Sequence, residues 1–110
     1  MPNDPEYASG GRTLVEVIAG LEADGYTGEF QTGTDAVIRC LTCDVSTPAG
    51  RLEVEAMRRI EGASDPADMA YVAGLRCPSC GTAGVAVLRY GPEAPLEDAD
   101  ALAALKPPAA

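Results

Sequence analysis

The sequence predicts an α+β fold in which one N-terminal helix packs on a small antiparallel sheet, with a pair of cysteine turns at one end. Three observations support this fold class: a helical pattern near the N-terminus, later segments with the character of strands, and four cysteines arranged as two CxxC pairs. A chain of 110 residues has room for one domain with one modest core. Because the chain has a single Phe and no Trp, that core must be built mainly from aliphatic side chains.

The helix is predicted over residues 13–24. Thr13 and Glu16 match a capping box, in which each side chain accepts a hydrogen bond from a backbone N–H of the first turn. Gly25 readily takes the left-handed conformation that often ends a helix. Apolar residues recur at the spacing i, i+3, i+4 and i+7, namely Leu14, Val17, Ile18 and Leu21. We expect this stripe to face the sheet.

Four segments are predicted to form strands: residues 36–39, 51–61, 70–75 and 85–90. The composition of the second segment favours a helix, but its apolar residues alternate as in a strand with one buried face, and we predict a strand. Residues 62–68, dense in Gly, Pro, Ser and Asp, should then reverse the chain. In the last strand, Val85 and Val87 should share one face and the residues that alternate with them the other.

The two ends of the chain are predicted to lie outside the folded domain. Residues 1–11 combine turn formers with acids and are expected to form a flexible lead-in, which leaves residues 12–91 as a single domain. Residues 92–110 form a Pro- and Ala-rich acidic tail, in which leucines at 96, 102 and 105 allow one short helix. A helix this short has marginal stability on its own, so the sequence leaves open whether the tail is frayed or forms a helix docked on the domain.

The net charge of −9 is concentrated in these two ends. Residues 1–35 contain seven acids and one Arg, and residues 91–110 contain four acids and one Lys, whereas residues 36–90 balance six arginines with six acids. A chain that is acidic and lacks a basic stripe is repelled by phosphate backbones. Binding to nucleic acid is therefore disfavoured.

The N-terminus lacks the basic start and apolar run of a secretory signal, and no segment approaches the roughly 20 apolar residues that cross a bilayer. We therefore expect a cytoplasmic protein with no membrane segment. In that reducing compartment, paired cysteines serve as metal ligands or redox centres more often than as disulfides.

The cysteines form the strongest motif in the sequence. Cys40-Leu41-Thr42-Cys43 and Cys77-Pro78-Ser79-Cys80 are two CxxC turns separated by 33 residues. Two residues between cysteines let both thiolates point at one ion, and two such turns complete a tetrahedral Cys₄ site. We predict a zinc-ribbon-like site whose ligands are Cys40, Cys43, Cys77 and Cys80. Two strands in the spacer would return the second pair beside the first.

An arginine directly precedes each pair, Arg39 in the first and Arg76 in the second. Four thiolates around Zn²⁺ leave a net charge of about −2. The two guanidinium groups could stabilise that charge from outside the ligand shell, or they could simply be exposed residues at strand ends. The sequence leaves both interpretations open.

Iron and redox chemistry are the alternatives to zinc. The segment Cys77-Pro78-Ser79-Cys80-Gly81 resembles a rubredoxin knuckle, although rubredoxins surround their iron with aromatic residues and this chain has few. A thioredoxin-like pair would lie at a helix N-terminus, whereas loop-like sequence follows both pairs here. Disulfides are disfavoured by the expected compartment.

The chain contains no histidine, which excludes histidine-based catalysis and the common catalytic zinc sites. An ion held by four cysteines also has no open coordination position, so we expect that the protein is not an enzyme. The first functional hypothesis is a non-catalytic module in which zinc fixes a surface that binds another protein. The alternative is a rubredoxin-like iron electron carrier.

Four further segments carry a family resemblance: residues 13–16, 25–30, 59–68 and 84–87. In this order they resemble a family of short bacterial proteins that is often labelled phosphoribosylpyrophosphate synthetase. The resemblance spans residues 13–91 and implies a domain made of a helix and an antiparallel sheet. This sequence departs from the family pattern by adding the two cysteine pairs. It also lacks the paired acids, Gly/Thr loop and following helix that a phosphoribosylpyrophosphate site needs.

Overall fold

The computed structural model describes residues 13–60, 69–91 and 94–106, which form a six-stranded sheet and two helices. The elements in chain order are α2 (Leu14–Ala23), β1 (Gly28–Gly33), β2 (Val37–Cys40), β3 (Ser46–Pro48), the short 3₁₀ helix η2 (Ala49–Arg51), β4 (Glu53–Ile60), β5 (Ala70–Arg76), β6 (Ala83–Arg89) and α3 (Leu96–Ala104). The predicted lead-in (residues 1–11) and chain reversal (residues 62–68) lie outside the described residues.

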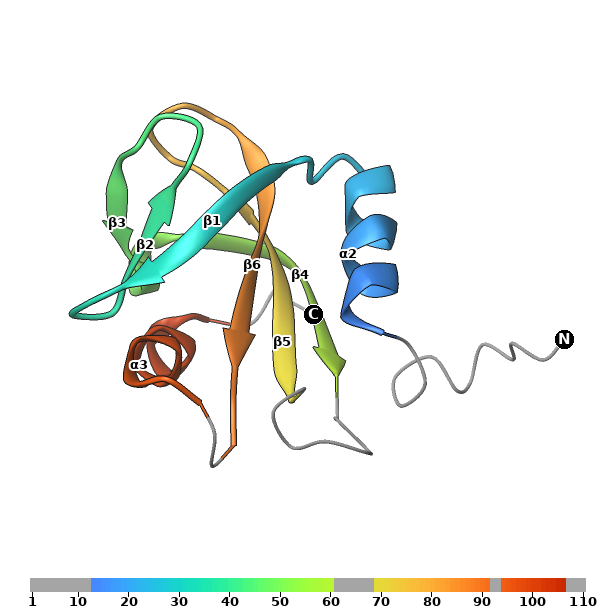
Figure 1. Ribbon diagram of the computed structural model, residues 1–110. Helices are drawn as coiled ribbons and strands as arrows, with labels where there is room; N and C mark the ends of the chain where they lie inside the picture. The colour runs from blue at the N-terminus through green and yellow to red at the C-terminus, as the bar shows by residue number, and fades with distance from the viewer. Residues whose placement is uncertain (1–12, 61–68, 92–93, 107–110) are drawn as a thin grey trace, which may run out of the picture.

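The strands are arranged in the order β3-β2-β1-β6-β5-β4 (Figure 1). Neighbouring strands are antiparallel except β1 and β6, which run parallel and pair over Gly28 with Gly84 and Glu29 with Val85. The α+β class is confirmed, and the expectation of a purely antiparallel sheet is corrected at this one pair. Because β1 and β6 are far apart in the chain, no hairpin turn forces them to be antiparallel.

The four predicted strands are present as β2, β4, β5 and β6, with small shifts at their ends. Two further strands were not predicted from the sequence. β1 has a glycine at each end and Phe30 as its one large apolar residue, so its alternation is weak. β3 has three residues and ends at Pro48, which suits the edge of a sheet because proline cannot donate to the ladder.

Helix α2 begins with the predicted capping box. The Thr13 N–H donates to Glu16 Oε1 at 3.0 Å, and the Glu16 N–H donates to Thr13 Oγ1 at 3.1 Å. Val17 and Leu21 of the predicted stripe are buried. They pack in a cluster with three strand residues, Ile60, Val72 and Val85. The stripe therefore faces the sheet, as expected.

Helix α3 packs against β1, β6 and η2. Ala101 and Leu105 are buried in the larger core cluster together with Phe30, Ile38, Leu75 and Leu88. In Figure 1, β5 and β6 run between α2 and α3. The short C-terminal helix is therefore docked, and the packed part of the chain extends beyond residue 91. The predicted faces of β6 are also present, because Val85 belongs to the cluster under α2 and Leu88 to the larger one.

Asp98 joins α3 to the two strands that run parallel. Its carboxylate accepts a hydrogen bond from the Thr32 hydroxyl of β1 at 2.6 Å and from the Arg89 backbone N–H of β6 at 3.0 Å. These bonds form beyond the short stretch over which β1 and β6 pair directly. The buried carboxylate thus links the strands where direct backbone pairing has ended.

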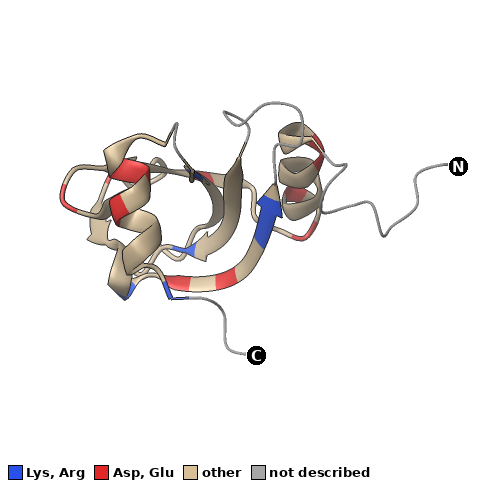
Figure 2. Cartoon of the chain, turned by 90° about the horizontal axis from the view of Figure 1, so that it is seen from below, with Lys and Arg blue, Asp and Glu red and all other residues tan. Residues whose placement is uncertain are grey.

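Both helices contain acids and neither contains Lys or Arg (Figure 2). Strands carry basic residues, and Figure 2 shows a basic stretch toward the end of β4, where Arg58 and Arg59 lie. Among the described residues, the net negative charge of the helices is therefore not balanced within them, whereas strand acids are accompanied by arginines. Within the three described ranges, no helix has the length and apolar character needed to cross a membrane.

Candidate metal centre

The two CxxC turns close two hairpins of the sheet. Cys40 ends β2, and the first turn leads through Cys43 into β3. Cys77 follows β5, and the second turn leads through Cys80 into β6. Both turns lie at the same end of the sheet, at the top of Figure 1. As predicted, the spacer contains an antiparallel strand pair, formed by β4 and β5.

The start of β1 holds the two turns side by side. The N–H of Leu41, in the first turn, donates to the carbonyl oxygen of Glu29 at 3.0 Å. Glu29 in turn pairs with Val85 of β6, the strand that leaves the second turn. One residue of β1 therefore bridges the two hairpins, and the distance between cysteine pairs depends on the contact between β1 and β6.

The two turns have the same backbone hydrogen bonds. In the first, the Cys40 N–H donates to the Val45 carbonyl at 3.0 Å, and the Asp44 N–H donates to the Cys40 carbonyl at 2.7 Å. The second repeats both bonds, at 2.8 and 2.9 Å, with Cys77, Thr82 and Gly81. Each pair of cysteines is thus held by an independently closed turn.

The residue after each second cysteine adopts a left-handed conformation, with φ of 65° at Asp44 and 79° at Gly81. Glycine takes this conformation without strain, and aspartate is among the few other residues that tolerate it. Gly81 belongs to the knuckle-like segment recognised in the sequence, whereas Asp44 was not predicted to be part of its turn. The available signal was that a conformationally permissive residue follows both CxxC pairs.

The four thiols converge on one point. All four Sγ atoms lie within 4.8 Å of one another. Two pairs that join different turns lie close together, Cys40 with Cys80 at 3.8 Å and Cys43 with Cys77 at 3.7 Å. An ion with metal–sulfur bonds of about 2.3 Å in a tetrahedron separates its ligands by about 3.8 Å. The four predicted ligands are therefore positioned to hold one metal ion.

The cysteines differ in their exposure to solvent. Cys40 and Cys77, the first residue of each pair, are buried in the larger core cluster. Cys43 packs against that cluster, and Cys80 is exposed. A bound ion would lie at the boundary of the core, with one of its ligands toward water. Loss of the ion would leave the two buried thiols within the apolar cluster.

Each of the two arginines that precede the pairs contacts the turn that follows it. Arg39 Nη1 forms an ion pair with Asp44 Oδ1 at 2.6 Å. Arg76 Nη1 donates to the Gly81 carbonyl at 3.4 Å, and its Nε pairs with Glu55 Oε2 at 2.7 Å. Both side chains are about half exposed, and each supports its own turn. Stabilisation of the metal–thiolate charge by the two arginines stays a prediction.

The Arg76 guanidinium also has an effect on its partner, because its hydrogen bonds hold the pKa of the Glu55 carboxyl below the usual value. The Tyr26 hydroxyl donates a third hydrogen bond to that carboxylate, at 3.0 Å, beside the two from Arg76. The second turn is thereby connected to β4 and to the segment between α2 and β1.

In the metal-free protein, the thiols have different acidities. The Thr82 hydroxyl lies 3.1 Å from Cys80 Sγ, and hydrogen bonds from this hydroxyl and from the Thr82 backbone stabilise the thiolate and lower the pKa of Cys80 to about 6. At Cys43, a backbone hydrogen bond from Val45 lowers the pKa. Burial and bonds with the other cysteines outweigh it and raise the pKa to about 12.

No family model, curated protein or solved structure matches the chain. The family resemblance of the short segments therefore stays a prediction. The fold and the four-cysteine site define a small α+β protein that can bind a metal ion.

Proposed function

We propose that this protein holds one structural zinc ion at Cys40, Cys43, Cys77 and Cys80, and that it acts as a non-catalytic module for protein interaction. The observation that carries the proposal is the spacing of the four sulfur atoms, which suits a tetrahedral ion with protein ligands at every position. Such an ion has no position for a substrate or a reactive water. Its role is then to fix the two turns.

The surface of the turns supports an interaction role. Leu41, inside the first turn, is 36 % exposed, and Val45, just after it, is 40 % exposed. Apolar side chains that point to water from a rigid turn are suited to contact another protein. Among the described residues, they are two of only four large apolar side chains that are this exposed.

A rubredoxin-like iron carrier is the second candidate, because the Cys77–Gly81 segment resembles a rubredoxin knuckle. The core around the cysteines favours zinc over iron. Of the buried residues in the larger cluster, Phe30 is the one aromatic, and the others that accompany Cys40 and Cys77 are aliphatic. Rubredoxins surround their iron with several aromatic residues.

Metal analysis and colour distinguish the two candidates. Protein purified without added metal should contain one zinc per chain, no free thiol that reacts rapidly, and no absorption band in the visible. One iron per chain with a visible band that bleaches on reduction would show the electron carrier instead. A metal content near zero with four titratable thiols would overturn both.

The interaction role requires its own experiment. A pull-down with the metal-loaded protein should recover a partner, and Leu41→Ser/Val45→Ser should lose it without loss of zinc. Val15→Ser is a matched control, because Val15 is 75 % exposed on α2, away from the turns. Equal recovery by all three proteins would exclude the turns as the binding surface.

A further inference from the structure

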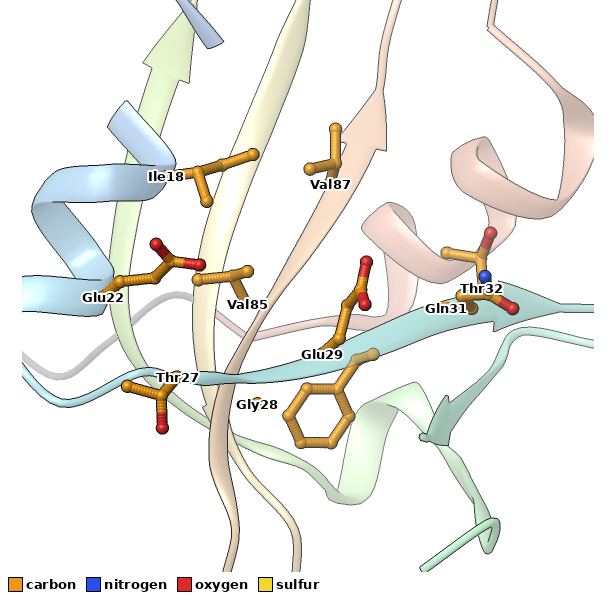
Figure 3. Close-up of a pocket in the computed structure, with 10 residues that line it drawn as sticks. Ile18, Glu22, Thr27, Gly28, Glu29, Gln31, Thr32, Val85 and Val87 are labelled. Carbon is orange, nitrogen blue, oxygen red and sulfur yellow. The ribbon is translucent and has the colours of Figure 1, made fainter. Parts of the chain in front are cut away.

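A trough of about 400 Å³ lies between α2, β1 and β6 (Figure 3). It exists because β1 and β6 pair directly over two residues only and then separate. Asp98 of α3 bridges the strands farther along, at Thr32 and Arg89. The trough therefore has a helix on one side and a strand on the other, and its far end is braced by a buried carboxylate.

The floor of the trough is apolar and its rims are acidic. Val85 and Val87 project from the same face of β6, because they are two residues apart in a strand. Ile18 of α2 adds an apolar wall. Glu22 lies one helical turn after Ile18, so both project from the same face of α2. Figure 3 shows the carboxylates of Glu22 and Glu29 projecting from α2 and β1, with Val85 between them in this view.

The two carboxylates have no ionic partner in the described part of the chain. No hydrogen bond or ion pair joins the side chain of Glu22 or Glu29 to another residue there. The lining contains no Lys or Arg. Elsewhere in the same ranges, acids such as Asp44 and Glu55 that flank the cysteine turns do have arginine partners. The trough thus offers negative charge beside an apolar surface with no internal cation to balance it.

An apolar floor beside two carboxylates favours a ligand with an apolar stem and a positively charged end group. Lysine and arginine have that shape, since their methylene stems lie along apolar surfaces while the charged group stays at the polar edge. A metal ion would not use the valine floor, and a neutral apolar ligand would not use the carboxylates. The net charge of −9 adds long-range attraction for a basic partner.

We propose that the trough binds a lysine or arginine side chain presented by a basic segment of a partner protein, with the stem on Val85 and Val87 and the head between Glu22 and Glu29. The proposal rests on the interaction role proposed above and identifies where part of the partner binds. Glu22, Thr27 and Glu29, which line the trough, are exposed to solvent, which suits a side chain carried on another surface. Because the Glu29 carbonyl oxygen also accepts a hydrogen bond from the Leu41 N–H, the trough adjoins the first cysteine turn.

The test is an NMR titration of the zinc-loaded protein with four small compounds. N-acetyl-lysine methylamide and its arginine analogue supply stem and charge, N-acetyl-norleucine methylamide supplies the stem alone, and methylamine supplies the charge alone. We expect saturable amide shifts at Ile18, Glu22, Glu29, Val85 and Val87 with the first two compounds only. Shifts of equal size with methylamine, or no shift with any compound, would overturn the proposal.

Two charge-matched double variants give the control. Glu22→Gln/Glu29→Gln should weaken binding of the lysine compound about fivefold or more, whereas Glu53→Gln/Asp100→Asn, outside the trough, should change it less than twofold. An equal loss in both would indicate attraction to net charge alone and overturn the site. A Kd for cadaverine more than tenfold lower than the Kd for the lysine compound would indicate a site for free amines. That result would also contradict the proposal that the trough binds a partner protein. Zinc content is measured on every sample, so a failed metal site is distinguishable from a failed trough.

Discussion

Removal of the metal is expected to unfold at least the end of the sheet that carries the cysteine turns. Structural zinc binding is worth roughly 10 to 16 kcal/mol in small peptides, which is comparable to or larger than the roughly 5 to 15 kcal/mol that stabilises a typical domain. Without the ion, the buried thiols of Cys40 and Cys77 would lose their ligand role inside the larger core cluster. That cluster has one aromatic residue, so its apolar area alone gives little reserve.

Thermal unfolding followed by circular dichroism, with and without a strong chelator, measures this effect. Cys77→Ser should reproduce the chelated state, whereas Ser79→Ala, an exposed residue of the same turn that is not a ligand, should retain the parent midpoint. The smaller cluster under α2 contains no cysteine, so part of the helical signal should survive. An unchanged midpoint and cooperativity after chelation and in Cys77→Ser would show that the metal does not stabilise the fold.

Acid should have the same effect as the chelator, because each cysteine thiol must lose its proton to bind the ion. The sign follows from protonation. As the pH falls, protons compete with the metal at all four sulfur atoms, so metal release and loss of the cooperative transition should occur at the same pH. Unfolding at a pH where the zinc is still bound would separate the two events.

Much of the fold was predictable because its signals are local. The capping box of Thr13 and Glu16 and the stripe that contains Val17 and Leu21 are contained within one helix, and both are present as predicted. The same holds for the two CxxC turns, whose spacing alone specifies that each pair can point at one ion. The four predicted strands also had enough β-type residues or alternation to be recognised.

The features that were missed depend on contacts between distant segments. β1 is stabilised by strands on both sides, although its own sequence alternates weakly. Besides Ala101 and Leu105 in the larger core cluster, α3 is held by Asp98, whose hydrogen bonds with Thr32 and Arg89 no periodicity can reveal. The trough is likewise a consequence of where two strands separate. For the metal site, the sequence indicated the ligands, and the structure added the turns' conformation, the roles of the arginines and the contact of Cys80 with Thr82.

The parallel contact between β1 and β6 leads to the second large effect, at Gly84. A Cβ atom on Gly84 would lie 2.5 Å from the backbone carbon and 2.6 Å from the carbonyl oxygen of Gly28. Backbone atoms cannot rotate away as a side chain can, so Gly84→Ala must push β1 and β6 apart. Because β1 also holds the first cysteine turn through Glu29 and Leu41, the two cysteine pairs should separate as well.

We expect Gly84→Ala to destabilise the zinc-loaded protein by about 3 kcal/mol, at the upper end for overpacked sites, and to weaken zinc binding measured by competition with a chromophoric chelator. Urea unfolding measures the first effect.

Gly20→Ala is the matched control, since a Cβ there meets nothing within 4 Å and lies inside α2. It should stabilise the protein by about 0.5 to 1 kcal/mol, because alanine favours helix more than glycine does. Gly28→Ala should cost less than Gly84→Ala, because its closest contact is the Thr82 side-chain methyl and its nearest backbone contact, the Ala83 carbonyl oxygen, is 3.1 Å away. If Gly84→Ala unfolds at the parent urea concentration and binds zinc as tightly, the close approach of β1 and β6 at this glycine does not position the metal site.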